Sequence, residues 1–325
     1  MKTAKKILSL ALVMLVCLGA LPVIGVSAVQ ESENGFVYEV KDGNAIIVGC
    51  DSTVSGDVII PSTLGGYAVT EIGEDAFEGN TVITGVTIPD SVLIVGWSSF
   101  DGCSNLKNVK IGNNVTTINF YAFRNCVSLE NVNIPDSVVN LYDRAFENCV
   151  SLESIKLGNG IKKIWCEVFK KCTSLKEIEI PDSVTTIGHL AFAFCTSLTD
   201  ITIGKNVEAI EYSAFESCTN VKSVTLHNTV KTIQWYTFKN CENLADVYFC
   251  GTEKQWKNIE IHADNEELTN ANIHYLYDCG CDHMSAYECS CNCHKDGIVG
   301  FFFKIINFLQ KIFGINKVCD CGAAH

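Results

Sequence analysis

The residues of this 325-residue chain that are best suited to chemistry are cysteines and histidines near its C-terminal end. Cysteine thiolates and histidine nitrogens are the usual ligands of tetrahedral zinc, and four of them complete one structural site. The stretch from residue 277 onward holds seven cysteines and three histidines, enough for one or two such sites. The candidate zinc ligands are Cys279, Cys281, Cys289, Cys291, Cys293, His294, Cys319 and Cys321, with His283 and His325 near them in the sequence.

The same cysteines allow two other interpretations. Their Cys-x-Cys spacing is shorter than the Cys-x-x-Cys pairs of many zinc sites. In a secreted chain they could form disulfides or crosslinks between molecules, although an odd number leaves one thiol over. They could also do neither, so the sequence leaves metal binding, disulfide formation and free thiols open.

An apolar segment at 298–313 separates two of the cysteine groups. As an α-helix it would place Lys304, Asn307, Gln310 and Lys311 on one stripe, with aromatic and aliphatic residues elsewhere. Such a helix reaches about 24 Å, short of the roughly 30 Å hydrocarbon core of a bilayer. We expect it to lie in the membrane interface with its lysines toward anionic head groups. The alternative is that it docks onto a partner or onto the end of the preceding region.

No pattern in the sequence indicates catalysis. The chain lacks a nucleophile elbow, a His-Glu-x-x-His helix and a P-loop, and its histidines are scattered. We therefore expect no enzymatic activity and no required cofactor, with zinc in the tail as one of the open alternatives. The formal net charge of −13 argues against nucleic-acid binding, which needs a clustered basic surface.

The element that must position any binding surface is a repeat of 23 residues. Phe-x-x-Cys pairs recur at this spacing, beginning at Phe100, Phe123, Phe146, Phe169, Phe192, Phe215 and Phe238, and Phe77 opens the series with Asn80 in the Cys position. An apolar residue follows three positions after each Cys, namely Leu106, Leu129, Leu152, Leu175, Leu198, Val221 and Leu244. A constant period in this range predicts a solenoid whose units bury their apolar faces by stacking.

Each repeat predicts its own local structure. Leu-x-x-Val-x-Ile alternates as a short strand of a parallel sheet, and Pro-Asp after it ends the strand in a turn. The Ala-Phe-x-x-Cys stretch is expected to form one helical or 3₁₀ turn. The fold class is therefore a mostly-β repeat solenoid of parallel strands and short turns.

The complete unit is seen almost whole in Cys172–Phe192, as Cys-x-Ser-Leu-x-x-x-x-Ile-Pro-Asp-Ser-Val-x-x-Ile-x-x-x-Ala-Phe. It resembles the BspA-like leucine-rich repeats of bacterial surface proteins, and Asp57–Gly73 is similar to the first turn of that family. The resemblance covers roughly residues 35–276. It implies a binding or adhesion scaffold at the cell surface, with a protein or glycan ligand on host or neighbouring cells.

The chain divides into five predicted parts. Residues 1–28 are typical of a signal peptide, because lysines precede an apolar run and Val26-Ser27-Ala28 offers small residues for cleavage. Residues 29–56 are expected to form an N-terminal hairpin cap around Asp42-Gly43. The repeats occupy 57–249, a C-terminal cap 250–276 and the Cys/His-rich tail 277–325. We therefore expect a secreted protein associated with the cell surface, and the rival interpretation is a structural protein whose tail drives envelope association or oligomerisation.

The cysteine column inside the repeats is expected to be structural. One thiol per turn at a fixed inward position behaves as a small buried apolar group. The alternatives are disulfides between neighbouring turns and metal binding. Cys50, Cys166 and Cys250 lie outside this column and receive no role.

A second column, just before the Ala-Phe stretch, carries large rings where the resembling family usually has polar residues. Exposed rows of rings can stack on sugars or anchor a protein interface. The candidate aromatic ridge consists of Trp97, Phe120, Tyr121, Trp165, His189, Tyr212, Trp235 and Tyr236. The alternative is that these rings lie flat and cover the core. The outward positions of the sheet strands are polar and mixed, which indicates a solvated face or a weak binding surface.

Overall fold

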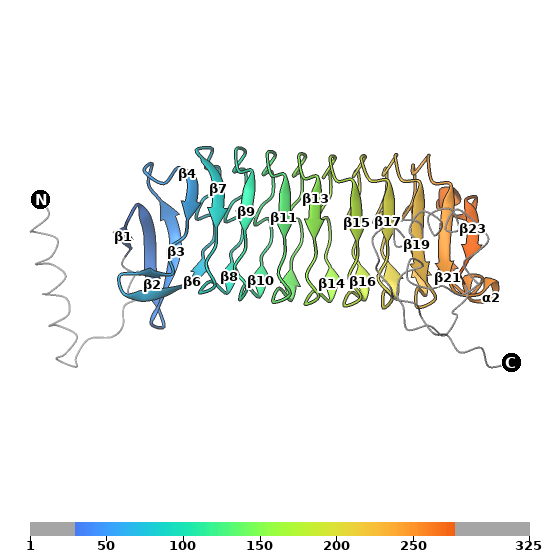
Figure 1. Ribbon diagram of the computed structural model, residues 1–325, viewed down its shortest axis with the longest axis horizontal. Helices are drawn as coiled ribbons and strands as arrows, with labels where there is room; N and C mark the ends of the chain where they lie inside the picture. The colour runs from blue at the N-terminus through green and yellow to red at the C-terminus, as the bar shows by residue number, and fades with distance from the viewer. Residues whose placement is uncertain (1–29, 277–325) are drawn as a thin grey trace, which may run out of the picture.

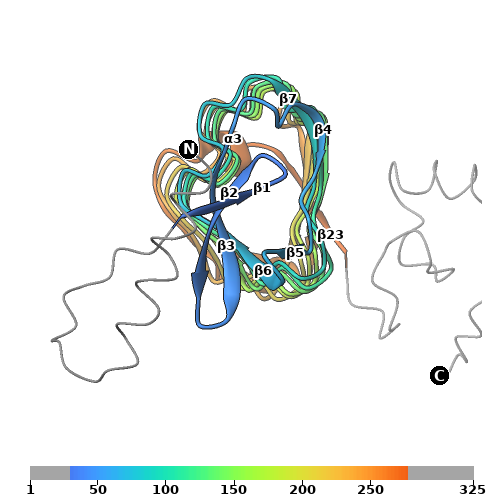
Figure 2. The ribbon, with the colours of Figure 1, turned by 90° about the vertical axis from the view of Figure 1, so that its left-hand side faces the viewer.

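The computed structural model describes residues 30–276, which wind into a row of stacked turns (Figure 1). Viewed along the row, successive turns superpose and enclose one core (Figure 2). The predicted signal peptide, the candidate zinc ligands and the 298–313 segment lie outside the described residues. The predicted solenoid is confirmed over the described region.

Two sheets carry the long strands on one side of the cross-section. Each repeat adds one strand, so sequence neighbours in a sheet are one turn apart. The first sheet contains β4 (Gly56–Ile59), β7 (Ile83–Thr87), β9 (Asn108–Lys110), β11 (Asn131–Asn133) and β13 (Ser154–Lys156). The second contains β15 (Glu177–Glu179), β17 (Asp200–Thr202), β19 (Ser223–His227), β21 (Asp246–Cys250) and β23 (Asn272–Tyr275).

Two further sheets carry the two-residue strands of the repeats, and one of them also contains the longer strands of the N-terminal end. One begins with β1 (Glu31–Glu33), β2 (Phe36–Lys41), β3 (Asn44–Cys50) and β6 (Tyr67–Ile72), continues with β8 (Ile94–Val95), β10 (Thr117–Ile118) and β12 (Asn140–Leu141), and has β5 (Thr63–Leu64) paired to β6. The other contains β14 (Lys163–Ile164), β16 (Thr186–Ile187), β18 (Ala209–Ile210), β20 (Thr232–Ile233) and β22 (Glu260–Ile261).

The strand register follows the repeat. Val132 pairs in parallel with Val109 on one side and with Ile155 on the other, so each apolar residue meets its counterpart one turn away. Along β11 the central Val132 is buried while Asn131 and Asn133 are exposed, as the period of two in a strand requires. The Leu-x-x-Val-x-Ile prediction is therefore confirmed.

The Ala-Phe-x-x-Cys stretch forms consecutive hydrogen-bonded turns and not the expected helical or 3₁₀ turn. Bonds from residue i+3 to residue i are present, such as Cys126 N–H to Phe123 O at 3.3 Å. However, Tyr121 just before the stretch and Asn125 within it have φ of 59° and 58°, in the left-handed region, which breaks a right-handed helix. Alternate N–H groups instead reach the next turn, as Phe123 N–H does at Ala145 O at 2.8 Å.

The core is a stack of phenylalanines with a parallel column of thiols. From Phe77 to Phe238 the eight rings are at most 2% exposed, and neighbouring centroids lie 4.9–5.7 Å apart. The seven cysteines of the column are free and buried. Each donates its S–H to the carbonyl of the Phe in the preceding Phe-x-x-Cys pair, as Cys149 does to Phe123 at 3.2 Å. The buried-thiol prediction is confirmed.

We expect the column thiols to resist alkylation in the folded protein. Burial raises the pKa of the Cys149 thiol well above its ordinary value, and the neighbouring thiols raise it further. Only the thiolate reacts, so modification should await global unfolding. Iodoacetamide labelling followed by peptide mapping should mark the half-buried Cys166 long before Cys149. Equal labelling rates at the two positions would contradict the buried column.

The two ends of the row are closed by different elements. β2 and β3 pair antiparallel around Asp42 and Gly43, whose φ values of 52° and 76° match the Asp-Gly hairpin signal. At the other end lie α2 (Glu253–Trp256) and α3 (Glu266–Thr269). Thr252 and Gln255 form a reciprocal capping box at the N-terminus of α2. β1 and α3 have no counterpart in the sequence prediction.

Neighbouring turns differ where their long strands end. Residues Pro89, Pro135 and Pro181 alternate with Gly112, Gly158 and Gly204. In the first of these pairs of turns, the backbone N–H of Asn113 donates to Asp90 Oδ1 at 2.7 Å. In the second, Asn159 donates to Asp136 Oδ1 at 2.8 Å. The structural unit at this edge is therefore a pair of unlike turns, with twice the period of the repeat.

Candidate binding surfaces

The ridge position lies at a corner of each turn, directly after a short strand. Trp97 follows β8 and is 46% exposed, while Phe100 three residues later is fully buried. Between them Ser98 has φ of 47°. The equivalent residue in each following turn, through Tyr236, is also left-handed, so the same corner recurs along the row.

The N-terminal part of the ridge is a continuous run of rings. The ring centroids of Phe120 and Trp97 lie 5.3 Å apart. Tyr142 stacks on Phe120 with a centroid distance of 4.9 Å and an angle of 9° between the ring planes. Trp165 follows Tyr142 at 5.7 Å. Stacked rings support one another, so these side chains form a rigid apolar strip four turns long. Tyr142, which in the sequence stands one position before the ridge column and adds to it, joins the run.

The C-terminal part is a second run. The ring centroid of Tyr212 lies 5.1 Å from that of His189 and 5.2 Å from that of Tyr236. Trp235 stacks on His262 with their ring centroids 3.9 Å apart. His262 comes from the residues after β22, where the constant spacing has ended. The periodic column therefore gives no signal for it.

The two runs are separated where Gly188 replaces a side chain at the position of Trp165. An ion pair crosses this turn, with Lys163 Nζ 3.0 Å from Glu211 Oε1, two turns away. The same ammonium lies 4.9 Å from the centroid of the Trp165 ring. Glu211 also accepts the backbone N–H of His189 at 3.2 Å. The interruption is thus polar and internally paired.

The predicted ridge residues differ in how available they are. Arg124 covers the ring of Tyr121 at 4.5 Å, and Lys239 covers that of Tyr236 at 4.3 Å, so both rings are engaged within the chain. Phe120 and His189 are half-buried between their neighbours. The residues exposed enough to contact a ligand are Trp97, Trp165, Tyr212 and Trp235, at 46%, 37%, 40% and 44%.

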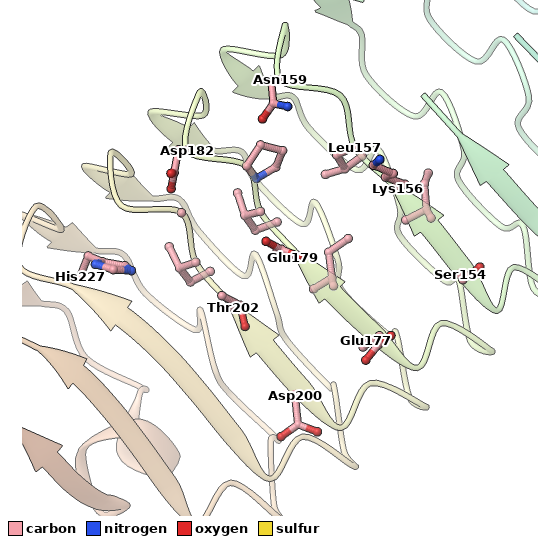
Figure 3. A pocket seen from close by; sticks show the side chains of 16 residues that line it. Ser154, Lys156, Leu157, Asn159, Glu177, Glu179, Asp182, Asp200, Thr202 and His227 are labelled. Carbon is pink, nitrogen blue, oxygen red and sulfur yellow. The ribbon is translucent and has the colours of Figure 1, made fainter. Parts of the chain in front are cut away.

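A second surface is the outward face of the long-strand sheets, which is hollowed along the row. One hollow on this face, called here the sheet groove, has a volume of about 570 Å³ and lies over β13, β15 and β17. Figure 3 shows Glu177, Glu179 and Asp200 projecting from this face, with Lys156 at one end and His227 at the other. Burial lowers the pKa of His227, which favours its neutral form.

The sequence shows which strand residues point outward but not that their face is hollow. The lining of the sheet groove combines outward strand residues with Pro181, Asp182 and Gly204 beyond the strand ends. The polar residues that the sequence assigns to a solvated face therefore line a groove.

Residues 30–276 were also searched for metal sites and for membrane-spanning helices. Among residues 30–276 no group of three or more His, Cys, Asp or Glu side chains is arranged to hold a metal ion. Within the same residues no helix has the length and apolarity needed to cross a bilayer. The zinc and membrane-interface hypotheses concern other residues and stay predictions.

Comparison with known proteins identifies a family pattern. The model of the family described as "BspA type Leucine rich repeat region" matches this chain in six copies, over residues 70–164 and 139–269. A search of curated proteins found no match. A leucine-rich repeat protein from T. pallidum is 25% identical, with 66% of this chain and 91% of that chain covered and a TM-score of 0.49.

Two other solved structures are also similar. A leucine-rich repeat protein from Bacteroides capillosus is 32% identical over 39% of this chain and 96% of its own, with a TM-score of 0.35. A leucine-rich cell surface protein from Faecalibacterium prausnitzii is 21% identical over 72% of this chain and 98% of its own, with a TM-score of 0.31.

Proposed function

The chain belongs to the BspA-type leucine-rich repeat family, and from this premise we propose an extracellular binding scaffold that holds a protein or glycan ligand on its aromatic ridge. The repeats provide a long, regular surface, and this surface performs recognition without chemical conversion of the ligand. The protein is displayed at the cell surface, where the Cys/His-rich tail retains it.

The observation that carries this proposal is the exposure of large rings in a row. Trp97, Tyr212 and Trp235 are each at least 40% exposed, whereas the phenylalanines of the core stack are at most 2% exposed. Exposed aromatic groups cost solubility and are typical of interaction sites when they gather on one face. Their neighbours hold them in place, so little conformational freedom is lost on binding.

The extracellular location has two supports. The predicted signal peptide at 1–28 provides an export route, and a relative of similar fold is described as a cell surface protein. Retention by the tail rests on the predicted interfacial segment 298–313. A structural or assembly role for the tail is the alternative, and it needs no ligand on the ridge.

We expect the triple variant Trp97→Ala, Tyr212→Ala and Trp235→Ala to lose binding about tenfold or more, because central aromatic residues dominate interface energies. Binding should be measured to a glycan array and to intact host and bacterial cells, with folding checked by circular dichroism. The control removes exposed side chains off the ridge, as Tyr67→Ala, Val82→Ala and Val139→Ala, which are 40%, 53% and 48% exposed. Unchanged binding by the ridge variant, or equal loss in the control, would exclude the ridge as the site.

A further inference from the structure

The sheet groove contains a pair of like charges in direct register. Glu177 of β15 is paired with Asp200 of β17, and both side chains point to the exposed face. Like charges directly opposite on neighbouring strands destabilise a sheet. Among the strand pairs in residues 30–276, no other register places two acidic or two basic residues opposite each other.

The rest of this column avoids such repulsion. Ser154 donates its hydroxyl to Asn131 Oδ1 at 2.5 Å, and Ser223 donates to Asp200 Oδ1 at 2.6 Å. The register pair of Glu177 and Asp200 lies between these two hydrogen-bonded pairs, each of which contains at least one neutral residue. The acidic pair is therefore a local departure that costs stability.

Three other acidic residues of the repeats are each matched by a cation one turn away. The ion pairs are Glu153 with Lys176 at 2.6 Å, Asp182 with Lys205 at 3.1 Å, and Glu208 with Lys231 at 2.7 Å. Within the described residues, Glu177 and Glu179 have neither an ion pair nor a side-chain hydrogen bond. Their charge is directed to solvent in the groove.

The shape of the groove suits an extended chain. Its lining includes the half-buried Ile155, which gives some apolar contact, whereas Ile178 between the two glutamates is buried toward the core. It runs across β13, β15 and β17, so neighbouring acidic positions repeat at about 4.8 Å, the spacing of strands. Lysine and arginine have apolar stems and charged ends, which match a partly apolar lining beside carboxylates.

We propose that the sheet groove binds a cationic segment of a partner polypeptide, with basic side chains placed between Glu177, Glu179 and Asp200. A basic group there removes the repulsion between the two strands and supplies the missing countercharge. The surface and its ligand are independent of the aromatic ridge.

The test uses a labelled oligopeptide of alternating lysine and serine and the secreted full-length chain. The groove variant is Glu177→Gln, Glu179→Gln and Asp200→Asn. The matched control removes equal charge from exposed residues outside the sheet face, as Glu74→Gln, Glu78→Gln and Glu242→Gln. We expect about tenfold or greater loss of affinity in the groove variant only, and weaker binding to the wild type at high salt.

Further measurements complete the test. Glu177→Gln alone should unfold at the same or a higher temperature than the wild type, because it removes repulsion, and the ridge variant should bind the peptide normally. Equal loss in the groove and control variants would mean non-specific attraction to an acidic protein and overturn the proposal. No loss in either would overturn it as well. Displacement of the peptide by millimolar calcium at constant ionic strength would assign the carboxylates to a divalent cation instead.

Discussion

Replacing Phe169 with alanine should lower the free energy of unfolding by about 3–5 kcal/mol, the range for large aromatic truncations in a core. The Phe169 ring is fully buried and stacks on Phe146 at 5.7 Å and on Phe192 at 5.2 Å. Truncation therefore leaves a cavity between two turns and breaks two ring contacts at once. In a solenoid each turn contacts only its neighbours. The substitution should therefore weaken the interface between the turns before Phe169 and the turns after it.

Urea unfolding followed by circular dichroism and tryptophan fluorescence would measure this effect. Trp97 and Trp165 lie in the half before Phe169, and Trp235 and Trp256 lie in the half after it, so uncoupled halves would give two fluorescence transitions in place of one. Phe194→Ala is the matched control, because this phenylalanine is 37% exposed in the same region and should cost less than about 1 kcal/mol. Similar losses in both variants would contradict a stability set by the buried stack.

The repeat period predicts most of the architecture because the same physical requirement recurs in every turn. Val132 must be buried between Val109 and Ile155, and their spacing in the chain matches their register in the sheet. Likewise, the inward positions of Phe146 and Cys149 follow from their constant place in the unit. Each added repeat supplies the same evidence again, so fold and core are predicted together.

The turns are less predictable because their backbone conformation has no consistent residue signal. Left-handed φ values occur at Leu190 and Glu167 as well as at Asn125 and Asn148. Asparagine tolerates this region, whereas leucine does not favour it. Contacts with the stacked neighbours impose the conformation, so the local sequence suggests a helical turn where the structure has none.

For the ridge, the sequence gives the column but not the exposure of each ring. Tyr121 and Tyr212 are both tyrosines near the same corner, yet Arg124 covers one and the other remains 40% exposed. That difference depends on side chains from adjacent turns. The groove is harder still, because its outline depends on how turns with Pro181 and Gly204 alternate beside β15 and β17.

The alternation of Pro and Gly turns is visible in the sequence only when the repeat is read in pairs. An ideal Cβ on Gly158 would lie 2.3 Å from the carbonyl oxygen of Pro135 and 2.5 Å from its carbonyl carbon. Gly112 and Gly204 meet the preceding proline in the same way, at 2.4 and 2.5 Å. The close approach is between backbones, and no flexible side chain can yield. Glycine at this position therefore sets how tightly the two unlike turns stack.

Gly158→Ala should accordingly destabilise the protein by about 3 kcal/mol, at the upper end for overpacking, because one turn must move away from the next. Gly49→Ala is the control, since a Cβ there meets only Val37 at an ordinary 3.8 Å. Urea unfolding of both variants measures the difference. A stability loss at Gly158 no larger than that at Gly49 would show that the paired turns adjust freely. In that case the alternation would not fix the stacking of the turns that line the sheet groove.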